Sequence, residues 1–413
     1  MEVNYNKEGV YKLLNKNENK IIFDIVQAAL FQKEIEIPKK VEWNRIFQEM
    51  KDQTIAGIPY EWLSSKNILD VETKKQWDKF MMFQMAFWIK LMQEQENLIQ
   101  LMKQNYINMV ILKGTAAAIY YPKPEVRSMG DIDFFVNPKD FQNACKIMIE
   151  NGYRSVHEKQ TSPHHIAFKK NKVTFEVHKS LSIIARNHVG NHQEYLQTLM
   201  ENGLVLAEQK KIEHWEFPTF PRLQNGLVLL LHITQHLKTG LGLRQILDWS
   251  MFVNQELDDE IWKTEFQPIL QKIGLETMAI TVTRMSQIYL GLTTERITWC
   301  LSADQKLCEK LLEYFMEKGN FGKKAAEKER GVKVLSVDKN WLEFLKKLQY
   351  NGRNNWKLTE KYWILRPFAW IYQMGLYIQL ALNRKHPIST FRKDWKKSRE
   401  RIQLFRKLKL FIK

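Results

Sequence analysis

Cysteine and sustained apolar sequence are scarce in this chain. Its 413 residues include three cysteines, Cys145, Cys300 and Cys308, an odd number without the spacing of a zinc site. This usage is typical of a reducing compartment rather than of a disulfide framework. The first residues, MEVNYNKEGVYKL, contain no apolar signal core, so we expect a cytoplasmic protein.

The apolar stretch PFAWIYQMGLYIQLAL, from Pro367, has sixteen residues and is interrupted by Gln373 and Gln379. A membrane-spanning helix needs about 20 apolar residues, so this stretch is short for one. It predicts a buried helix. The alternative is an interfacial helix anchored by Trp370, Tyr372 and Tyr377, peripheral to the inner face of a membrane.

Acidic residues are too few to balance the basic ones, and the formal net charge is +17. The tail from Asn383 to Lys413 alone carries twelve lysines and arginines against Asp394 and Glu400. A run of this kind is ordinarily a solvated face. An anionic membrane surface and a nucleic acid are the two partners that its charge would also suit.

Two aspartates, Asp131 and Asp133 in the run DIDFFV, are the most informative residues that are present. In an extended strand they share one face, while Ile132 and Phe134 point to the other. Adjacent carboxylates repel each other unless a cation neutralises them, and oxygen ligands suit Mg²⁺ or Mn²⁺ better than zinc. The pair predicts a divalent metal site, with a solvated turn as the alternative.

Upstream, a buried strand predicted at 109–112 leads into Lys113, Gly114 and Thr115, which open the helical run AAAIYY. A strand, a glycine and a helix start form a phosphate-binding geometry, because the first amides of a helix lack internal partners and its dipole favours anions. Gly114 and Thr115 are therefore candidate phosphate contacts, and Lys113 adds a positive charge. A capping Thr115 and a solvated Lys113 are the alternatives.

Downstream, the run VTFEVH alternates, with Glu176 on the polar face of a half-buried strand. It predicts a hairpin of strands 165–169 and 172–178, turned around Lys170 and Asn171. Glu176 would then be a third carboxylate on a neighbouring strand, unless it forms an ion pair with Lys169. For His178 we expect a hydrogen-bonded structural role.

His232 and His236 lie one helical turn apart, which is also a zinc-ligand spacing. Their helix lacks the acidic neighbour of a zinc protease motif, and its leucines predict close packing. We expect structural or substrate-lining histidines rather than metal ligands.

Several of these segments together resemble the DNA polymerase β-like nucleotidyltransferase superfamily and, more narrowly, the bacterial family described as uncharacterised nucleotidyltransferases. The segments are LKGTAAAIYY, Arg127 before GDIDFFV, NGY, FEVH and the later LLLHITQHLKTGLGLRQILDW. The resemblance covers roughly 109–249 and implies transfer of a nucleotidyl group from a nucleoside triphosphate to an acceptor hydroxyl. It also implies a pair of divalent ions held by carboxylates.

Carried over residue by residue, the resemblance makes Asp131 and Asp133 metal ligands and turns Gly114 and Thr115 toward the triphosphate. Glu176 takes the place of the third carboxylate, as a metal ligand or general base. Many members have Gly-Ser, a shorter gap before the first aspartate and a third aspartate. Here the residues are threonine, a gap containing two prolines, and glutamate.

Three basic residues would serve the nucleotide. Arg127 or Lys113 would stabilise negative charge as the α-phosphate is attacked, and the resemblance sets Arg244 beside the nucleotide with Asp248. For Arg127, an ion pair with Glu125 or Asp131 remains equally open.

We therefore expect an α+β protein with a small mixed-sheet polymerase β-like nucleotidyltransferase core embedded in a mostly helical chain. The expected divisions are a helical N-terminal region (1–105), the catalytic core (106–185), a helical substrate and nucleotide-side domain (186–320) and a helical C-terminal region with the basic tail (321–413).

The expected reaction uses a Mg²⁺- or Mn²⁺-bound nucleoside triphosphate, such as ATP, and an acceptor that the sequence does not identify. One alternative is a catalytically silent module that binds nucleotide or nucleic acid. The other is a membrane-surface protein of cell-envelope polysaccharide synthesis.

Overall fold

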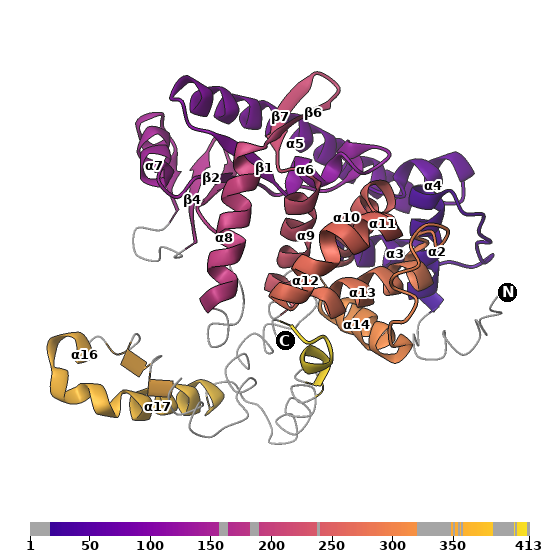
Figure 1. Ribbon diagram of the computed structural model, residues 1–413. Coiled ribbons are helices and arrows are strands. Elements are labelled where there is room, and N and C mark those ends of the chain that lie inside the picture. Colours follow the sequence, from indigo (N-terminus) through magenta and orange to yellow (C-terminus); the bar gives the residue numbers. More distant parts are fainter. Residues whose placement is uncertain are drawn as a thin grey trace. The chain divides into compact units, whose positions relative to one another are not determined.

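The computed structural model describes residues 17–156, 164–181, 190–237, 240–319, 348–349, 352–353, 356, 358–382, 400 and 403–410. The chain divides into two compact units, Met1–Lys324 with Leu408–Lys413, and Ala325–Lys407. The first unit contains the sheet and most of the described helices (Figure 1). Most of the basic tail lies outside the described residues, and with it the expected docking to a membrane or a nucleic acid.

Four helices precede the sheet in the described part of the first unit: α2 (Asn17–Phe31), α3 (Trp43–Asp52), α4 (Tyr60–Lys66) and α5 (Val71–Gln104). The long helix α5 begins where the carboxylate of Asp70 accepts a hydrogen bond of 2.8 Å from the amide of Thr73. This bond satisfies one of the free amides of the first turn and holds the pKa of Asp70 below its usual range. The Met-rich and aromatic sequence of α5 thus forms one continuous helix.

A seven-stranded mixed sheet lies at the centre of the first unit, in the order β3-β4-β5-β2-β1-β7-β6. Its strands are β1 (Met109–Leu112), β2 (Asp131–Val136), β3 (Arg154–Ser155), β4 (His165–Lys170), β5 (Val173–His178), β6 (Glu208–Ile212) and β7 (Trp215–Thr219). The β2–β5 and β1–β7 pairs are parallel, and the other pairs are antiparallel. The chain therefore has the expected α+β character.

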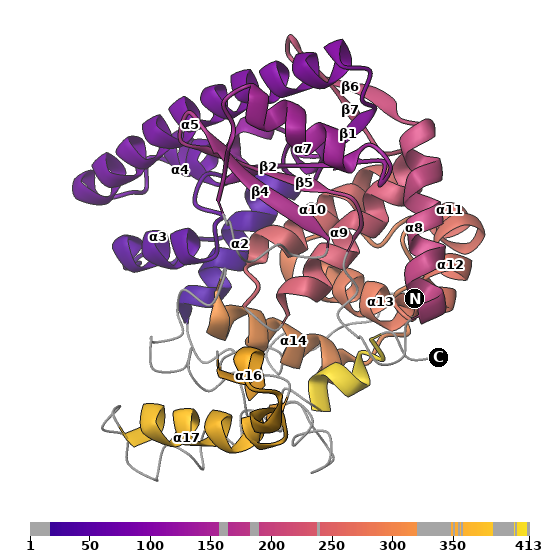
Figure 2. The ribbon, with the colours of Figure 1, turned by 90° about the vertical axis from the view of Figure 1, so that its left-hand side faces the viewer.

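One face of the sheet is apolar and packs against α5 and α7 (Phe141–Glu150), which lie beside the sheet in Figure 2. Ile132, Phe134 and Phe175 on this face join Leu91 and Leu98 of α5 in one buried cluster. Each fully buried apolar side chain contributes roughly 1.5–3 kcal/mol, so this cluster is a main source of stability. Because side chains alternate along a strand, the carboxylates of β2 and β5 are displayed on the opposite face.

Two local predictions need correction. The hairpin of β4 and β5 turns at Asn171 and Lys172, with φ of 50° and 66°, one residue later than expected. Positive φ at both central residues matches the twist of the flanking strands. The region 186–320, expected to be helical, contributes β6 and β7, and β7 pairs with β1, so the sheet extends beyond residue 185.

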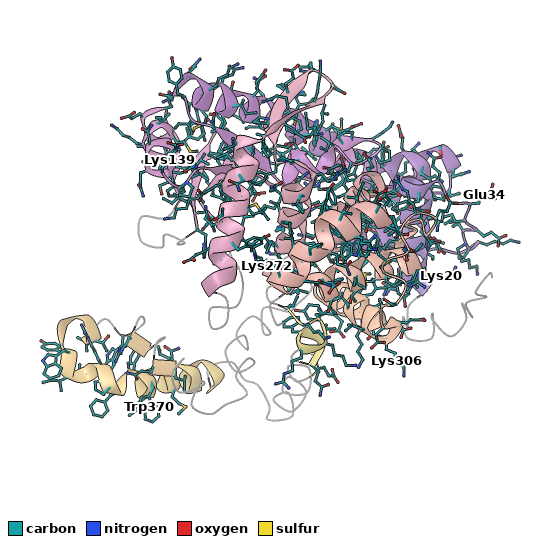
Figure 3. The ribbon with its side chains drawn as sticks, in the orientation of Figure 1. Lys20, Glu34, Lys139, Lys272, Lys306 and Trp370 are labelled. Carbon is teal, nitrogen blue, oxygen red and sulfur yellow. The ribbon has the colours of Figure 1, made fainter. Side chains whose placement is uncertain are left out.

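The remaining helices of the first unit follow one another along the chain. They are α6 (Gly114–Ala118), the short turn η1 (Pro124–Val126), α8 (Gly190–Val205), α9 (Arg222–His236), α10 (Leu243–Glu256), α11 (Asp259–Ile261), η2 (Trp262–Phe266), α12 (Gln267–Ile273), α13 (Glu276–Met285), η3 (Ser286–Leu290) and α14 (Gln305–Lys318). The ammonium of Lys272 on α12 lies 3.6 Å from the ring centroid of Tyr195 on α8 (Figure 3). This cation–π contact joins two helices that are far apart in sequence.

The second unit contains α16 (Leu358–Lys361), η6 (Trp363–Phe368) and α17 (Ala369–Leu382). The ring of Trp356 stacks on that of Tyr372, with centroids 5.0 Å apart. The apolar stretch from Pro367 does form a helix, but Phe368 and Ile371 are exposed while Ala369 and Gln373 are buried, so it is only partly covered. Among the described residues, no helix is long and apolar enough to cross a membrane.

Candidate functional site

The three predicted carboxylates lie on two neighbouring parallel strands. In the register of β2 and β5, Asp133 is directly opposite Glu176, and Asp131 is opposite Thr174. Asp133 is buried, whereas Asp131 and Glu176 are half-buried. The structure therefore brings together the DxD pair and the third acid, which sequence spacing alone placed only on adjacent strands.

Asp133 is the most heavily partnered of the three acids. Its Oδ1 atom accepts from the ammonium of Lys113 at 3.0 Å and lies 3.0 Å from Nε2 of His178. Burial alone would raise the pKa of Asp133, but Lys113 and His178 outweigh it and hold that pKa well below its usual range. Asp133 is therefore a carboxylate at any pH near neutrality.

Asp131, two residues earlier, has the opposite character. Its carboxylate has no hydrogen-bond partner among the described residues. Burial, and then the negative charge of Asp133, raise its pKa to about 6. Ionised Asp131 is thus a source of electrostatic strain that a bound cation would relieve.

His178 links the carboxylates, which the sequence reasoning did not foresee. Its Nε2 atom lies 3.5 Å from Oε2 of Glu176 as well as 3.0 Å from Asp133. Burial would lower the pKa of His178, but the hydrogen bonds to Asp133 and Glu176 raise it. The alternation that set His178 and Glu176 on one face of β5 was the available signal. The expected ion pair between Glu176 and Lys169 is absent among the described contacts of Glu176, which instead has His165 at 3.8 Å.

The donor set fits a divalent metal ion. Asp133, Glu176 and His178 each offer one ligand atom, and these atoms lie within 4.8 Å of one another. Two carboxylates suit Mg²⁺ or Mn²⁺, and an imidazole nitrogen adds affinity for the transition metal of the two. Asp131 is not a member of this group, so its role as a ligand remains a prediction. We call Asp131, Asp133, Glu176, His178 and Lys113 the carboxylate cluster.

Three further predicted site residues, Lys113, Gly114 and Thr115, lie directly after β1. Lys113 has φ of 50° and Gly114 φ of 39°, a conformation that glycine adopts easily and lysine rarely. The hydroxyl of Thr115, which is buried, lies 2.7 Å from Oε1 of Gln95 and donates to it. The threonine thus does not cap α6 with its side chain, and its hydroxyl is committed to α5.

Arg127 forms an ion pair with Asp248 on α10, and not with Glu125 or Asp131 as the sequence suggested. Its Nε and a terminal nitrogen donate to the two carboxylate oxygens at 2.9 Å and 2.6 Å. The hydroxyl of Tyr121 donates to the same carboxylate at 2.9 Å. Arg127 and Asp248 are buried, so the charge of Arg127 is neutralised within the protein, and its role toward a nucleotide stays a prediction.

Arg244 is the second arginine of this neighbourhood, and among the described residues no carboxylate forms an ion pair with it. It donates to the backbone oxygen of Ser128 at 2.8 Å, and its buried Nε has no acceptor among the described residues. Burial, and then the charge of Arg127, lower the pKa of Arg244. We call Arg127, Arg244, Asp248 and Tyr121 the arginine cluster.

His232 and His236 pack against each other on α9, with ring centroids 4.6 Å apart. Burial, followed by the positive charge of Lys113, lowers the pKa of both rings, that of His236 to about 4. Both are therefore neutral near pH 7.

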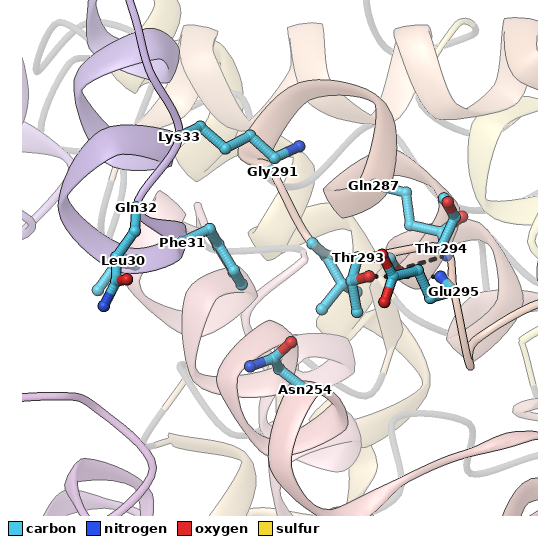
Figure 4. Close-up of a pocket in the computed structure, with 11 residues that line it drawn as sticks. Leu30, Phe31, Gln32, Lys33, Asn254, Gln287, Gly291, Thr293, Thr294 and Glu295 are labelled. Atoms are coloured by element: carbon cyan, nitrogen blue, oxygen red, sulfur yellow. Dashed lines mark hydrogen bonds between the residues drawn. The ribbon is translucent and has the colours of Figure 1, made fainter.

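A cavity of about 550 Å³ lies elsewhere, where the end of α2 meets Asn254 and the segment from Gln287 to Glu295 (Figure 4). The backbone oxygen of Thr293 accepts a bond of 3.1 Å from Gln287 on its wall. None of the predicted site residues lines it. The cavity is therefore separate from the carboxylate cluster.

The carboxylates thus lie on neighbouring strands of a mixed sheet, and the arginine cluster acts electrostatically on Asp131. Residues 39–291 match the family described as uncharacterised nucleotidyltransferase. The match spans more than half of the 413 residues, and the chain belongs to this family.

Among solved structures, the chain is similar to the crystal structure of an antigenic nucleotidyltransferase-like protein from Paracoccidioides brasiliensis. The two share 15% identity with a TM-score of 0.28, over 46% of this chain and 91% of that one. A likeness this distant does not inform the site. A comparison with curated proteins gave no match.

Proposed function

We propose that this chain is a metal-dependent nucleotidyltransferase of the polymerase β-like type. It would move a nucleoside monophosphate from a Mg²⁺- or Mn²⁺-bound nucleoside triphosphate, such as ATP, to an acceptor hydroxyl. The observation that supports this most directly is the register of β2 and β5, which sets Asp133 opposite Glu176 with Asp131 on the same face. Three acids in so small a space destabilise a protein unless they serve a cation.

In this proposal Asp131, Asp133 and Glu176 hold the metal, with His178 as a neighbouring nitrogen donor. The metal would lower the pKa of the acceptor hydroxyl and neutralise charge on the triphosphate. Glu176, half-buried and directly opposite Asp133 on the neighbouring strand, is the candidate to receive the acceptor proton.

Arg244 and the turn after β1 would bind the triphosphate. The guanidinium of Arg244 lacks a carboxylate partner among the described residues, so a phosphate oxygen would satisfy its Nε. Gly114 and Thr115 contribute through their backbone amides, because the hydroxyl of Thr115 is bound to Gln95. Arg127 acts indirectly, through Asp248 and the backbone oxygen of Ser128 that it shares with Arg244.

A thermal unfolding series tests this function. The midpoint should rise with one nucleoside triphosphate only when Mg²⁺ or Mn²⁺ is present, since a ligand at 100 times its Kd adds about 2.7 kcal/mol to the folded state. Asp131→Asn should abolish the shift, and Glu150→Gln, at the exposed end of α7, should retain it. A shift that needs no metal, or that survives Asp131→Asn, would contradict the proposal and favour a silent nucleotide-binding module.

Attachment to an anionic membrane surface is a second candidate role, favoured by exposed apolar side chains in the second unit. Trp363 is 74% exposed and Ile364 65%, and they lie beside exposed Tyr362 and Phe368. Aromatic rings next to a basic segment suit the lipid headgroup region. Sedimentation with phosphatidylserine vesicles should fall with salt and with the double substitution Trp363→Ser and Phe368→Ser. Equal sedimentation with phosphatidylcholine alone would argue against this role.

A further inference from the structure

Lys113 lies within the carboxylate cluster. Its ammonium is 3.0 Å from Oδ1 of Asp133, and its side chain is only 15% exposed. Burial would lower the pKa of Lys113, but Asp133, Asp131 and Glu176 together raise it. All three acids of the proposed metal site therefore act on this one ammonium.

The backbone at Lys113 is unfavourable for a lysine. Its φ of 50° and ψ of −136° lie outside the regions that residues with a side chain usually adopt. Such a conformation persists only where its surroundings hold it in place. The ammonium beside Asp133 is thus carried by an unfavourable backbone position.

The ammonium and a divalent ion would use the same carboxylate. The Oδ1 atom of Asp133 already faces both Lys113 and His178, and Asp133, Glu176 and His178 are the residues whose ligand atoms cluster within 4.8 Å. A dication among these atoms would repel an ammonium held at its present distance from Asp133. A divalent ion that binds here would therefore displace the ammonium of Lys113 from Asp133.

We propose that Lys113 serves as the resident cation of the carboxylate cluster in the free protein and gives up this place when metal and nucleotide arrive together. The triphosphate, rich in negative oxygens, then becomes the partner of the ammonium. This inference rests on the proposed function. Its consequence is an order of binding in which the metal enters with the nucleotide and binds poorly before it.

Mn²⁺ binding, measured by calorimetry and by the paramagnetic resonance signal of free Mn²⁺, tests the proposal. The proteins are the wild type and Lys113→Met, with Lys123→Met as the matched control, since Lys123 is an exposed lysine of the same loop region paired with Glu61. Without nucleotide, Lys113→Met should bind Mn²⁺ at least roughly tenfold more tightly than the wild type, a change of about 1.4 kcal/mol. The control should match the wild type.

With a mixture of the four nucleoside triphosphates, the wild type should bind Mn²⁺ tightly. The Mn²⁺ affinity of Lys113→Met should then be little higher than that of the wild type. Lys113→Gln, whose amide can still donate to Asp133, is the second variant if the methionine protein does not fold. Equal Mn²⁺ affinity of wild type and variant without nucleotide, together with tight binding by the wild type when nucleotide is added, would overturn the role of Lys113 and leave the proposed function standing. Tighter Mn²⁺ binding by the variant, with no Mn²⁺ binding by the wild type under any condition, would contradict the proposal that the metal replaces Lys113 when nucleotide is added. Absence of Mn²⁺ and nucleotide binding in every protein would instead overturn the proposed function.

Discussion

The two buried charge clusters of the first unit are unbalanced in opposite directions. In the carboxylate cluster, three acids face Lys113 and His178, and the carboxylate of Asp131 has no hydrogen-bond partner among the described residues. In the arginine cluster, two guanidinium groups share the single carboxylate of Asp248. A free protein gains nothing from either excess, because buried charge without a partner is destabilising.

The difference shows how one ligand could satisfy both clusters. Asp131 contributes to raising the pKa of Arg244, and Arg244 contributes to lowering that of Asp131, so the two excesses already influence each other. A metal ion bound to a triphosphate carries positive charge at one point and negative charge around it. The metal ion would compensate the excess negative charge of the carboxylate cluster, and the phosphate oxygens would compensate the excess positive charge of the arginine cluster.

The largest effect is expected where the arginine cluster loses its only acid. Asp248→Asn would leave Arg127 and Arg244 buried without a counter-charge, and breaking a buried pair costs about 3–5 kcal/mol. Urea unfolding should show this loss, while Asp24→Asn, which removes a surface pair with Lys20, should change stability by less than about 1 kcal/mol. Equal losses in the two variants would show that the arginine cluster does not depend on Asp248.

The second prediction is that substitutions of Asp131 and Asp133, the two aspartates of β2, change the stability of the protein in opposite directions. The pKa of Asp131 is raised to about 6 in the folded protein, so its ionised form disfavours folding. This penalty is absent below about pH 4, where the carboxyl is protonated in both states, and complete above about pH 6. Asp131→Asn should therefore stabilise the metal-free protein at pH 7 by on the order of 2–3 kcal/mol and have little effect at pH 4.

Asp133→Asn should do the reverse. The pKa of Asp133 is lowered by Lys113 and His178, so its charge stabilises the fold above the carboxyl's ordinary pKa and this contribution fades as the pH falls. Urea unfolding of both variants at the two pH values checks the comparison. If the two asparagine variants shift stability in the same direction at pH 7, the contrast between the aspartates is wrong.

The smallest effect on stability, but a clear one on binding, is expected at Arg244. A hydrogen bond to a charged group contributes about 1.5–3 kcal/mol, so Arg244→Met should weaken metal-dependent triphosphate binding by roughly tenfold to a hundredfold. The unfolding free energy should change little, because Arg244 has no ion-pair partner to lose in the part of the chain that the structure describes. Arg222→Met, which removes an outer contact with Glu265, is the matched arginine control in a calorimetric titration.

Much of the sheet was readable from sequence, because short apolar and alternating runs signal buried strands directly. The limits of β1 were correct, and the faces of β2 and β5 followed from alternation. β6 and β7 were missed since EQKKI is nearly all polar and WEFPT contains Pro218, which argues against an inner strand. The turn was predicted one residue too early because lysine seldom adopts a positive φ, whereas Lys172 does so here.

The acids of the candidate site could be found in sequence, but their partners could not. Asp131, Asp133 and Glu176 lie within 46 positions of one another on strands that alternation orients. The partner of Arg127 is Asp248, 121 residues away on a helix, and local pattern carries no information about such a contact. The same is true of Thr115, whose hydroxyl donates to Gln95 of α5.

The pairing of β1 with β7 has a consequence for where this protein can be cut. A fragment of residues 106–185, although it contains all three acids, would lack β7 and expose one edge of β1 to other chains. It would also lack Asp248, which leaves Arg127 without its carboxylate. A fragment meant for isolated study should therefore begin before α5 and continue at least to Glu256, where α10 ends.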